Sequence, residues 1–561
     1  MAEVLFGQSY YLRFDPKLWD AMQPYPPLGT LYAAAYIRER GYDVALFDAM
    51  LADSEERWAE ALDRHSPRFA VLYEDNFNYL SKMCLLRMRE AAITMTRMAR
   101  QRGCTVILCG ADATDHSDLY FAADVDYVLQ GEGEITLGEL MDSLTGRSQQ
   151  PVEEILGLGR AVNSEQLTVN SRHAGPQESG VEWIEVRGSE GQKLDDGEPA
   201  TTGRDTISGS PQSPLPTPHS PFSAPRPLIR NVDSLPRPAW DLIDVEQYRK
   251  VWIERHGYYS MNMVTTRGCP FHCNWCAKPI WGQRYNSRSA EDVAAELKWL
   301  KETYHPDHIW FVDDIMGLKP GWMSRFADAV ERLDAHVPFK CLSRVDLLVR
   351  DGDIDALRRA GCQIVWVGAE SGSQKILDAM EKGTKVEQIY EAAQRLHEAG
   401  VKVAFFLQFG YPGETRADIE KTLQMVRDCQ PDDVGMSVSY PLPGTKFYDR
   451  VRDELGAKQN WQDSSDLAML YEGPYATEFY RHLHTVLHKE YRARKTWGAL
   501  TGQNGGHRPG PRQIGAMVYH TATLPIARRK LRQLEALPHQ GLLALPPEMS
   551  QQAAATPTPQ E

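Results

Sequence analysis

Three cysteines within eight positions constrain this chain more than any other feature. Cys269, Cys273 and Cys276 have the spacing C-x₃-C-x₂-C and directly follow an apolar, strand-like run at 263–265. Iron–sulfur clusters bind cysteine thiolates, normally four of them. Three closely spaced thiolates can hold three irons of a cubane and leave the fourth iron open to a small molecule. The loop therefore predicts a [4Fe–4S] cluster on Cys269, Cys273 and Cys276.

A zinc site is the alternative use of these thiols, with His272 as a fourth ligand. Zinc prefers tetrahedral sets of Cys and His, usually built from two C-x₂-C pairs. The sequence contains no second pair, so the spacing favours the cluster. The other six cysteines are scattered, several of them in apolar runs, where a buried and inert thiol is expected.

Strand-like and helix-like segments alternate in the second half of the chain. Apolar runs occur at 263–265, 308–312, 339–342, 364–367, 403–407 and 434–438. Helical patterns join them at 290–304, 321–333, 386–399 and 416–428. Repeated βα units predict a (β/α)6 partial TIM barrel, whose functional loops follow the carboxyl ends of the strands. The cysteine loop is one of these loops.

The first 160 residues show the same alternation on a smaller scale. Short apolar runs at 4–6, 44–47, 69–73, 105–109 and 127–129 are separated by helical stretches such as 30–40 and 85–102. This pattern predicts an α/β fold with a doubly wound, Rossmann-like parallel sheet. Such sheets bind ligands at the carboxyl ends of their strands, where Gly110 and the run Gly131-Glu132-Gly133 fall.

Composition divides the chain into five parts. We expect a Rossmann-like domain at 1–160, a flexible linker at 161–230, a barrel domain at 231–455, a C-terminal helical extension at 456–535 and a disordered tail at 536–561. Ser and Pro dominate the linker at 208–226. Such a segment cannot bury enough apolar surface to offset the entropy of ordering. Within the linker, 183–186 has the pattern of a short strand.

Charge and hydropathy exclude several classes of function. The net charge of −14 argues against a broad nucleic-acid surface. No run approaches the roughly 20 apolar residues of a membrane span, so no transmembrane segment is expected. The N-terminus lacks the basic and then apolar pattern of a signal peptide, which predicts a cytoplasmic protein.

Taken together, the barrel motifs resemble those of the radical S-adenosylmethionine (SAM) superfamily. Trp275 stands where that family has an aromatic residue beside the cluster, and the segments 311–314, 343–346, 368–372 and 408–414 resemble its SAM-binding loops. The resemblance implies a cluster that cleaves SAM reductively, with flavodoxin or ferredoxin as electron donor. The implied SAM contacts are Asp313, Asp314, Arg344, Glu370, Ser371, Gly410 and Pro412.

The N-terminal part resembles the cobalamin-binding domain that precedes many radical SAM barrels. The resemblance rests on the segments 26–29, 40–44 and 125–134. It implies a cobalamin site at Gly29, Gly110, Gly131, Glu132 and Gly133. The Asp-x-His-x-x-Gly signature of many corrinoid proteins is missing, since His116 has no Gly at the right spacing. A cobalt without a histidine ligand from the protein is expected, and a Rossmann-like domain without a cofactor is the alternative.

The resemblance leaves several activities open. The first is a class B type of methyl transfer to an unactivated carbon of a small-molecule, lipid or tetrapyrrole substrate. The second is oxidative cyclisation or rearrangement, as in the anaerobic magnesium-protoporphyrin ester cyclase. A methylthiotransferase is disfavoured because Cys84, Cys104 and Cys109 do not resemble its second cluster set. A non-catalytic corrinoid or iron–sulfur sensor is the alternative from another class. The sequence does not name the substrate.

Overall fold

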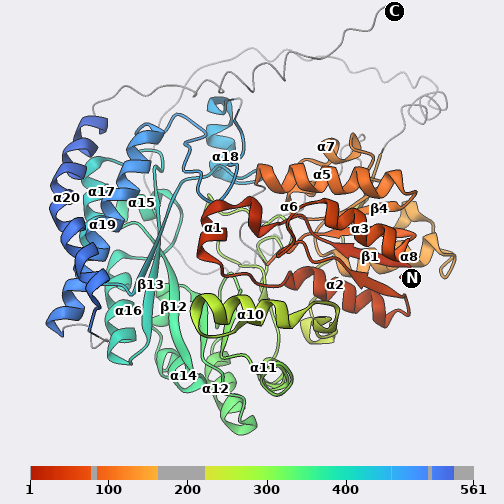
Figure 1. Ribbon diagram of the computed structural model, residues 1–561, viewed down its shortest axis with the longest axis horizontal. Coiled ribbons are helices and arrows are strands. Elements are labelled where there is room, and N and C mark those ends of the chain that lie inside the picture. The colour runs from red at the N-terminus through yellow and green to blue at the C-terminus, as the bar shows by residue number, and fades with distance from the viewer. Residues whose placement is uncertain (1, 78–84, 162–221, 457, 503–507, 536–561) are drawn as a thin grey trace, which may run out of the picture.

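The computed structural model describes residues 2–77, 85–161, 222–456, 458–502 and 508–535. Two α/β units lie side by side, and two long C-terminal helices cover the outer side of the second unit (Figure 1). Most of the expected linker, the strand expected at 183–186 and the expected tail lie outside the described residues.

The N-terminal unit is built on a six-stranded sheet of order β2-β1-β3-β4-β5-β6. Neighbouring strands are parallel except for β6, which is antiparallel to β5. The strands are β1 (Val4–Gly7), β2 (Val44–Leu46), β3 (Phe69–Tyr73), β4 (Thr105–Cys109), β5 (Tyr127–Leu129) and β6 (Leu158–Arg160). The helices are α1 (Pro16–Ala21), α2 (Leu28–Glu39), α3 (Glu56–His65), α5 (Leu86–Gln101), α6 (Ala111–Asp115), α7 (Ser117–Phe121) and α8 (Gly133–Leu144).

Both faces of this sheet are covered, as the continuous apolar runs of its strands require. Helices α2 and α8 pack on one face, and α3 and α5 pack on the other. Every residue of β3 is buried as a result. The predicted doubly wound sheet is therefore confirmed.

The second unit is a six-stranded parallel sheet of order β14-β13-β12-β11-β10-β7, curled into a partial barrel. The strands are β7 (Ser260–Met263), β10 (His308–Phe311), β11 (Phe339–Ser343), β12 (Cys362–Glu370), β13 (Lys402–Phe409) and β14 (Asp433–Val438). The helices are α10 (Val245–His256), α11 (Ala290–Tyr304), α12 (Trp322–Leu333), α13 (Val345–Leu348), α14 (Asp353–Ala360), α15 (Gln374–Ala379), α16 (Val386–Glu398) and α17 (Arg416–Cys429). This confirms the predicted partial barrel of six strands.

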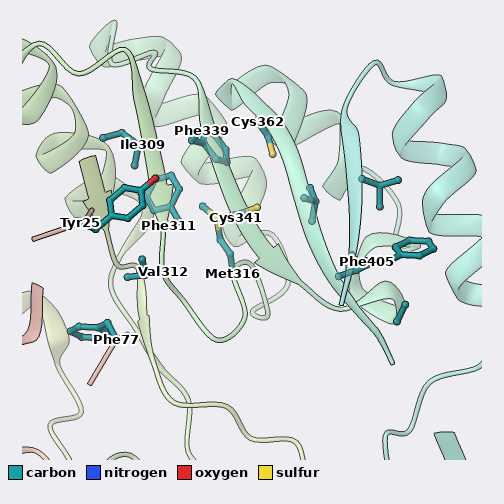
Figure 2. Close-up of a cluster of buried hydrophobic side chains, with 14 of the residues drawn as sticks. Tyr25, Phe77, Ile309, Phe311, Val312, Met316, Phe339, Cys341, Cys362 and Phe405 are labelled. Carbon is teal, nitrogen blue, oxygen red and sulfur yellow. The ribbon is translucent and has the colours of Figure 1, made fainter. Parts of the chain in front are cut away.

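Apolar side chains fix the helices to the outer face of the barrel sheet. Phe311 and Phe339 lie edge to face, with ring centroids 5.0 Å apart, and both pack against Phe326 of α12. Figure 2 shows Phe311 and Phe339 on adjacent strands of this layer. Aromatic pairs of this geometry add to the stabilisation that burial of the rings provides.

The first barrel strand ends earlier than predicted, at Met263 instead of 265. The backbone N–H groups of Thr265 and Thr266 donate to the Asp313 carboxylate, so they leave the strand ladder. Thr266 and Arg267 form the short strand β8 (Thr266–Arg267), which pairs antiparallel with β9 (Asn286–Ser287). A side chain 47 residues away in the sequence thus decides where this strand stops.

The C-terminal extension is helical, with α18 (Lys446–Val451), α19 (Thr477–Thr501) and α20 (Pro511–Glu535). Glu490 of α19 is buried and pairs with Arg427 of α17 and Arg528 of α20, which fixes the hairpin to the barrel. No described helix is both long and apolar enough to cross a membrane.

The described end of the expected linker packs against the first unit. Phe222 forms a bridge with Gly159 of β6, and the Arg226 guanidinium pairs with Glu139 of α8. Residues 222–230 therefore belong to the described structure, and flexibility stays a prediction for 162–221.

Candidate active site

The cysteine loop lies at the carboxyl edge of the barrel sheet, between β8 and β9. Cys269 is buried in a small apolar cluster with Ile315 and Leu347, against which Phe271 packs. The loop begins at Gly268, whose φ of +80° lies in the left-handed region. A Cβ atom at Gly268 would stand 2.4 Å from the carbonyl oxygen of Arg284, so no larger residue fits there.

Gly268→Ala is therefore expected to distort the cysteine loop. The alanine meets both a left-handed backbone and a backbone oxygen that cannot move aside. We expect the purified, reconstituted variant to hold less than half of the wild-type iron, measured by a colorimetric iron assay. Gly257→Ala is the matched control, because Gly257 has a similar φ of +78° with nothing near its Cβ position. Equal iron in wild type and Gly268→Ala would contradict this role of Gly268.

The three thiols influence one another and share polar neighbours. Burial raises the pKa of the Cys276 thiol to about 12, although the Lys278 ammonium opposes this shift. Burial also raises the pKa of Cys269, and Asp314 and Cys273 add to that effect. Thiols that resist ionisation when free need a strong Lewis acid to hold them as thiolates, which is what bound metal does.

The donor set fits a cluster better than a single ion. No group of three or more His, Cys, Asp or Glu side chains converges on a single-ion site within the described residues. A cubane spaces its cysteine ligands more widely than a single ion does, and iron–sulfur clusters take thiolates. Three buried or half-buried thiols in one loop, grouped beside Lys278, meet that requirement.

Asp313 holds the cysteine loop in place. Its Oδ1 accepts from Thr265 N at 2.7 Å, Thr266 N at 2.6 Å and Thr266 Oγ1 at 2.9 Å, and its Oδ2 accepts from Thr265 Oγ1 at 3.1 Å. Burial raises its pKa to about 6 in spite of these hydrogen bonds. Both oxygens hold the chain just before the cysteine loop, and the contact of Asp313 with SAM stays a prediction. The neighbouring Asp314 is exposed and lies within electrostatic reach of Cys269 and Cys276.

Arg344 carries a positive charge to the cysteine loop. Its guanidinium lies 3.6 Å from the centre of the Phe271 ring, donates to the Cys273 sulfur at 3.9 Å and pairs with Asp346 at 2.9 Å. A further donation, at 2.9 Å, reaches the carbonyl oxygen of Lys382. The structure thus brings the predicted residue Arg344 to the loop, at the end of β11.

Glu370 forms a buried ion pair at the end of β12. Its Oε1 lies 2.8 Å from Lys382 Nζ, and both side chains are less than a tenth exposed. Glu370 has a φ of +56°, next to an irregularity in the pairing with β13. A Cβ at Gly368 would fall 2.5 Å from this carboxylate, so the glycine makes room for the pair. Strained backbone of this kind gathers at functional sites.

The other predicted barrel residues support the framework around the site. Ser371 is fully buried, with its hydroxyl 3.1 Å from that of Thr422 on α17. The N–H of Gly410 donates to Glu414 at 2.7 Å, and its carbonyl oxygen accepts from Tyr471 of the C-terminal extension. Pro412 lies in the turn that follows, half-buried.

Glu414 is a buried carboxyl whose charge the fold disfavours. Its Oε1 has no hydrogen-bond partner among the described residues. Burial, with the nearby Asp418 adding to it, raises the pKa of Glu414 from 4.5 to about 8. The folded chain therefore holds a proton that the unfolded chain releases between about pH 4.5 and 8. Stability from this group is complete below that window and is lost as the pH rises through it.

Glu414→Gln is expected to remove this loss of stability. Relative to wild type, the variant should gain up to about 1.4 kcal/mol per pH unit within the window, because the amide does not ionise. Urea unfolding midpoints from pH 5 to 9 measure the difference. A difference that stays constant with pH would show that Glu414 does not change its protonation on folding.

An ion-pair network that sequence reasoning missed joins the two units. Arg267, two residues before Cys269, lies 3.1 Å from Glu132 Oε1 and 2.7 Å from Glu134 Oε1. All three side chains are at most 4% exposed. Burial opposes the charge of Arg267, but the two carboxylates outweigh it and raise the pKa of Arg267 above its ordinary range. Glu132 and Glu134 after β5 were the only sequence signal for this network, and the sequence did not indicate their partner.

The glycines predicted for cobalamin meet at one edge of the first sheet, around the end of β3. Gly29 N donates to Asp75 at 2.9 Å, Gly133 N donates to the Tyr73 hydroxyl at 3.2 Å, and a Cβ at Gly110 would lie 2.9 Å from Glu74. Gly131, with a φ of +75°, approaches Ile280 of the barrel unit. Residues 74–76, which follow β3, are buried.

The cobalamin contacts of these residues stay a prediction, because a Cβ at Gly29, Gly110 or Gly133 would meet atoms of the chain itself. Glycines allow backbone to approach a flat ligand closely. Glu132 accepts from Arg267 of β8, just before the cysteine loop, and from Ile229 N. Two-domain α/β proteins bind ligands where such edges meet.

The chain contains a domain of the radical SAM superfamily, and it is an enzyme. The model of that family matches residues 263–426, a segment that contains all three cysteines of the loop together with Asp313, Arg344, Glu370 and Gly410.

Comparisons with individual proteins extend the match beyond this segment. The chain is 25% identical to an uncharacterized methyltransferase of Pyrococcus horikoshii over 78% of this chain and 81% of that protein. It is 22% identical to the anaerobic magnesium-protoporphyrin IX monomethyl ester cyclase of Synechocystis sp., over 75% of this chain and 72% of the cyclase.

Solved structures share the whole arrangement of two units. The cobalamin-dependent SAM radical enzyme OxsB, with aqua-cobalamin bound, matches with a TM-score of 0.62 and 14% identity over 95% of this chain and 72% of that one. The radical SAM methyltransferase TsrM from Kitasatospora setae, with cobalamin and a [4Fe–4S] cluster bound, matches with a TM-score of 0.55 and 16% identity over 81% and 75%. At these identities the likeness establishes the fold.

Proposed function

We propose that this chain is a cobalamin-dependent radical SAM methyltransferase. The observation that carries the proposal is the position of the cysteine loop, which touches Arg344 on one side and is joined through Arg267 to Glu132 and Glu134 at the ligand-binding edge of the first sheet. The methyltransferase name of the Pyrococcus relative and the cobalamin of the OxsB and TsrM structures support it.

Within this proposal each part of the site has a task. Cys269, Cys273 and Cys276 hold the cluster, and Gly29, Gly110, Gly131, Glu132 and Gly133 line the cobalamin site. When bound, these groups supply the electron that cleaves SAM to methionine and a 5′-deoxyadenosyl radical, and the methyl group that is transferred. The chain orients SAM and keeps water and oxygen away from the radical. Flavodoxin or ferredoxin is the proposed source of the electron.

SAM would lie between the cysteine loop and the ends of β11 to β13. Arg344 and the Glu370–Lys382 pair place fixed charges there, which suit the carboxylate and amine of the methionyl part. Asp314 is the better candidate than Asp313 for the amine, because the Asp313 oxygens hold Thr265 and Thr266. Gly410 and Pro412 follow β13, where backbone can approach the adenine.

The products formed from SAM test the proposal. The full chain, reconstituted anaerobically with iron, sulfide and cobalamin, is reduced and incubated with SAM, and 5′-deoxyadenosine and S-adenosylhomocysteine are measured by mass spectrometry. We expect both, because methyl transfer converts one SAM into each product. If a chain that holds its cluster and is shown by calorimetry to bind SAM forms no deoxyadenosine, the radical SAM part of the proposal is wrong.

Oxidative cyclisation is the second candidate, and the match to the Synechocystis cyclase over three quarters of this chain favours it. It predicts deoxyadenosine without S-adenosylhomocysteine, so the same assay separates the two. A methylthiotransferase would need a second cluster, but Cys104 and Cys109 are buried in the first unit, in and next to β4.

A further inference from the structure

Four side chains share the concave face of the barrel sheet. Trp310 pairs in register with Lys340, and Gly368 pairs with Phe406, while Trp366 lies two residues before Gly368 on the same strand. In a parallel sheet, residues paired in register point to the same face, and so do residues two apart. We call Trp310, Lys340, Trp366 and Phe406 the inner wall, opposite the face that packs on α12.

The side chains of the inner wall are partly exposed, although they lie in strands whose other face is covered by helices. Phe406 is 39% exposed, whereas its neighbour Phe405 on the outer face is fully buried. Trp310, Lys340 and Trp366 are half-buried. Exposed aromatic surface inside a barrel is available to a ligand, because ligand sites are concave and mostly apolar.

The aromatic part of the wall is a stacked pair of rings. Trp366 and Phe406 stack with ring centroids 4.6 Å apart and an interplanar angle of 29°. Gly435 on the next strand leaves room for both rings, since a Cβ there would lie 3.3 Å from Phe406 and 3.5 Å from Trp366. A planar molecule can continue this stack on its outer ring face.

Lys340 is a single cation within this wall. Its Nζ lies 4.6 Å from the centre of the Trp310 ring and 5.3 Å from that of Tyr25, which reaches in from the first unit. Among the described residues its Nζ forms no ion pair and no hydrogen bond, although the Asp433 carboxylate acts on it electrostatically. Burial lowers the pKa of Lys340 to about 8, so it is still largely protonated at neutral pH. A desolvated cation whose counter-charge lies beyond ion-pair distance is costly, and an anionic ligand would relieve that cost.

The position of Lys340 sets the length of such a ligand. Lys340 lies four residues before Arg344 at the carboxyl end of the same strand, which is about 13 Å along the strand axis. Arg344 contacts Cys273 in the cysteine loop. A molecule anchored at Lys340 and about 10 Å long therefore extends to the cysteine loop.

We propose that the inner wall binds the substrate, and that the substrate is a planar aromatic or conjugated carboxylic acid. Its carboxylate pairs with Lys340, and its ring system lies on Trp366 and Phe406. The inference that the bound acid is the substrate rests on the proposed function. Binding of the acid does not rest on it, because binding requires neither the cluster nor SAM.

A matched pair of probes tests the proposal by calorimetry on the full-length chain. The acid probe is 2-anthracenecarboxylate, which is planar, and 2-anthracenecarboxamide is its neutral counterpart. Wild type is expected to bind the acid at least tenfold more tightly than the amide. Lys340→Met should abolish that preference by weakening the acid alone, Lys340→Arg should keep it, and Trp366→Leu should weaken both probes. Lys298→Met, on the outer helix α11, is the control and should bind as wild type does.

Equal binding of acid and amide by wild type, or no binding of either, would overturn the proposal. An acid preference that survives in a folded Lys340→Met chain would overturn it too. The outcome is independent of the SAM assay: a chain that binds the acid through Lys340 but cleaves no SAM loses the proposed function and keeps this inference. The reverse result keeps the proposed function and removes this inference.

Discussion

Cys273→Ala is expected to abolish SAM cleavage, with at least a hundredfold loss of 5′-deoxyadenosine formation. The substitution leaves two thiols in the loop, which cannot hold three irons of a cubane. It also removes the sulfur that Arg344 contacts at 3.9 Å. Iron content and the visible absorption of the reconstituted chain should fall together with the activity, and both are measured on the same sample.

Cys429→Ala is the matched control, because Cys429 is a buried thiol at the end of α17, away from the loop. It should keep wild-type iron and activity. Wild-type iron and deoxyadenosine in Cys273→Ala would remove the cluster assignment. If the wild type, purified under anaerobic conditions, contains one equivalent of zinc and no iron, the loop is a zinc site.

Arg267→Met is expected to destabilise the chain more than any surface substitution, by about 3–5 kcal/mol. The variant leaves Glu132 and Glu134 buried, at most 4% exposed, without their counter-ion. It also removes a guanidinium that lies over the rings of Tyr32 and Phe77, with distances of 5.6 and 5.8 Å to their centroids. Urea unfolding followed by circular dichroism measures the shift.

Two comparisons show whether the loss of charge pairing or the loss of packing causes the destabilisation by Arg267→Met. Arg38→Met removes an exposed pair with Asp241 and should cost about 1 kcal/mol or less. Adding Glu132→Gln and Glu134→Gln to Arg267→Met should recover a large part of the loss, because no buried carboxylate then lacks a partner. If Arg267→Met shifts the midpoint no more than Arg38→Met does, the network does not hold the two units together.

Local sequence patterns were enough to predict the architecture. Residues of β3 form an apolar run because both faces of its sheet are covered, and α11 spans Ala290–Tyr304, the range that its helical pattern predicted. The C-x₃-C-x₂-C spacing placed the loop after the first barrel strand without any structural information. These features depend on residues close to one another in the chain, and for this reason a sequence reveals them.

Contacts between distant residues were not predictable in this way. Asp313 accepts from Thr265 and Thr266, across 48 and 47 residues respectively, and ends a strand early, which no local pattern indicates. Arg267 and Glu134 are 133 residues apart, and the sequence around neither residue indicates their contact. The inner wall exists only because the strand register turns Lys340, Trp366 and Phe406 to one face. The sequence by itself determined the two folds and the cysteine loop. The tertiary structure alone decided which charges meet, because buried charges are stable only beside partners that the fold brings to them.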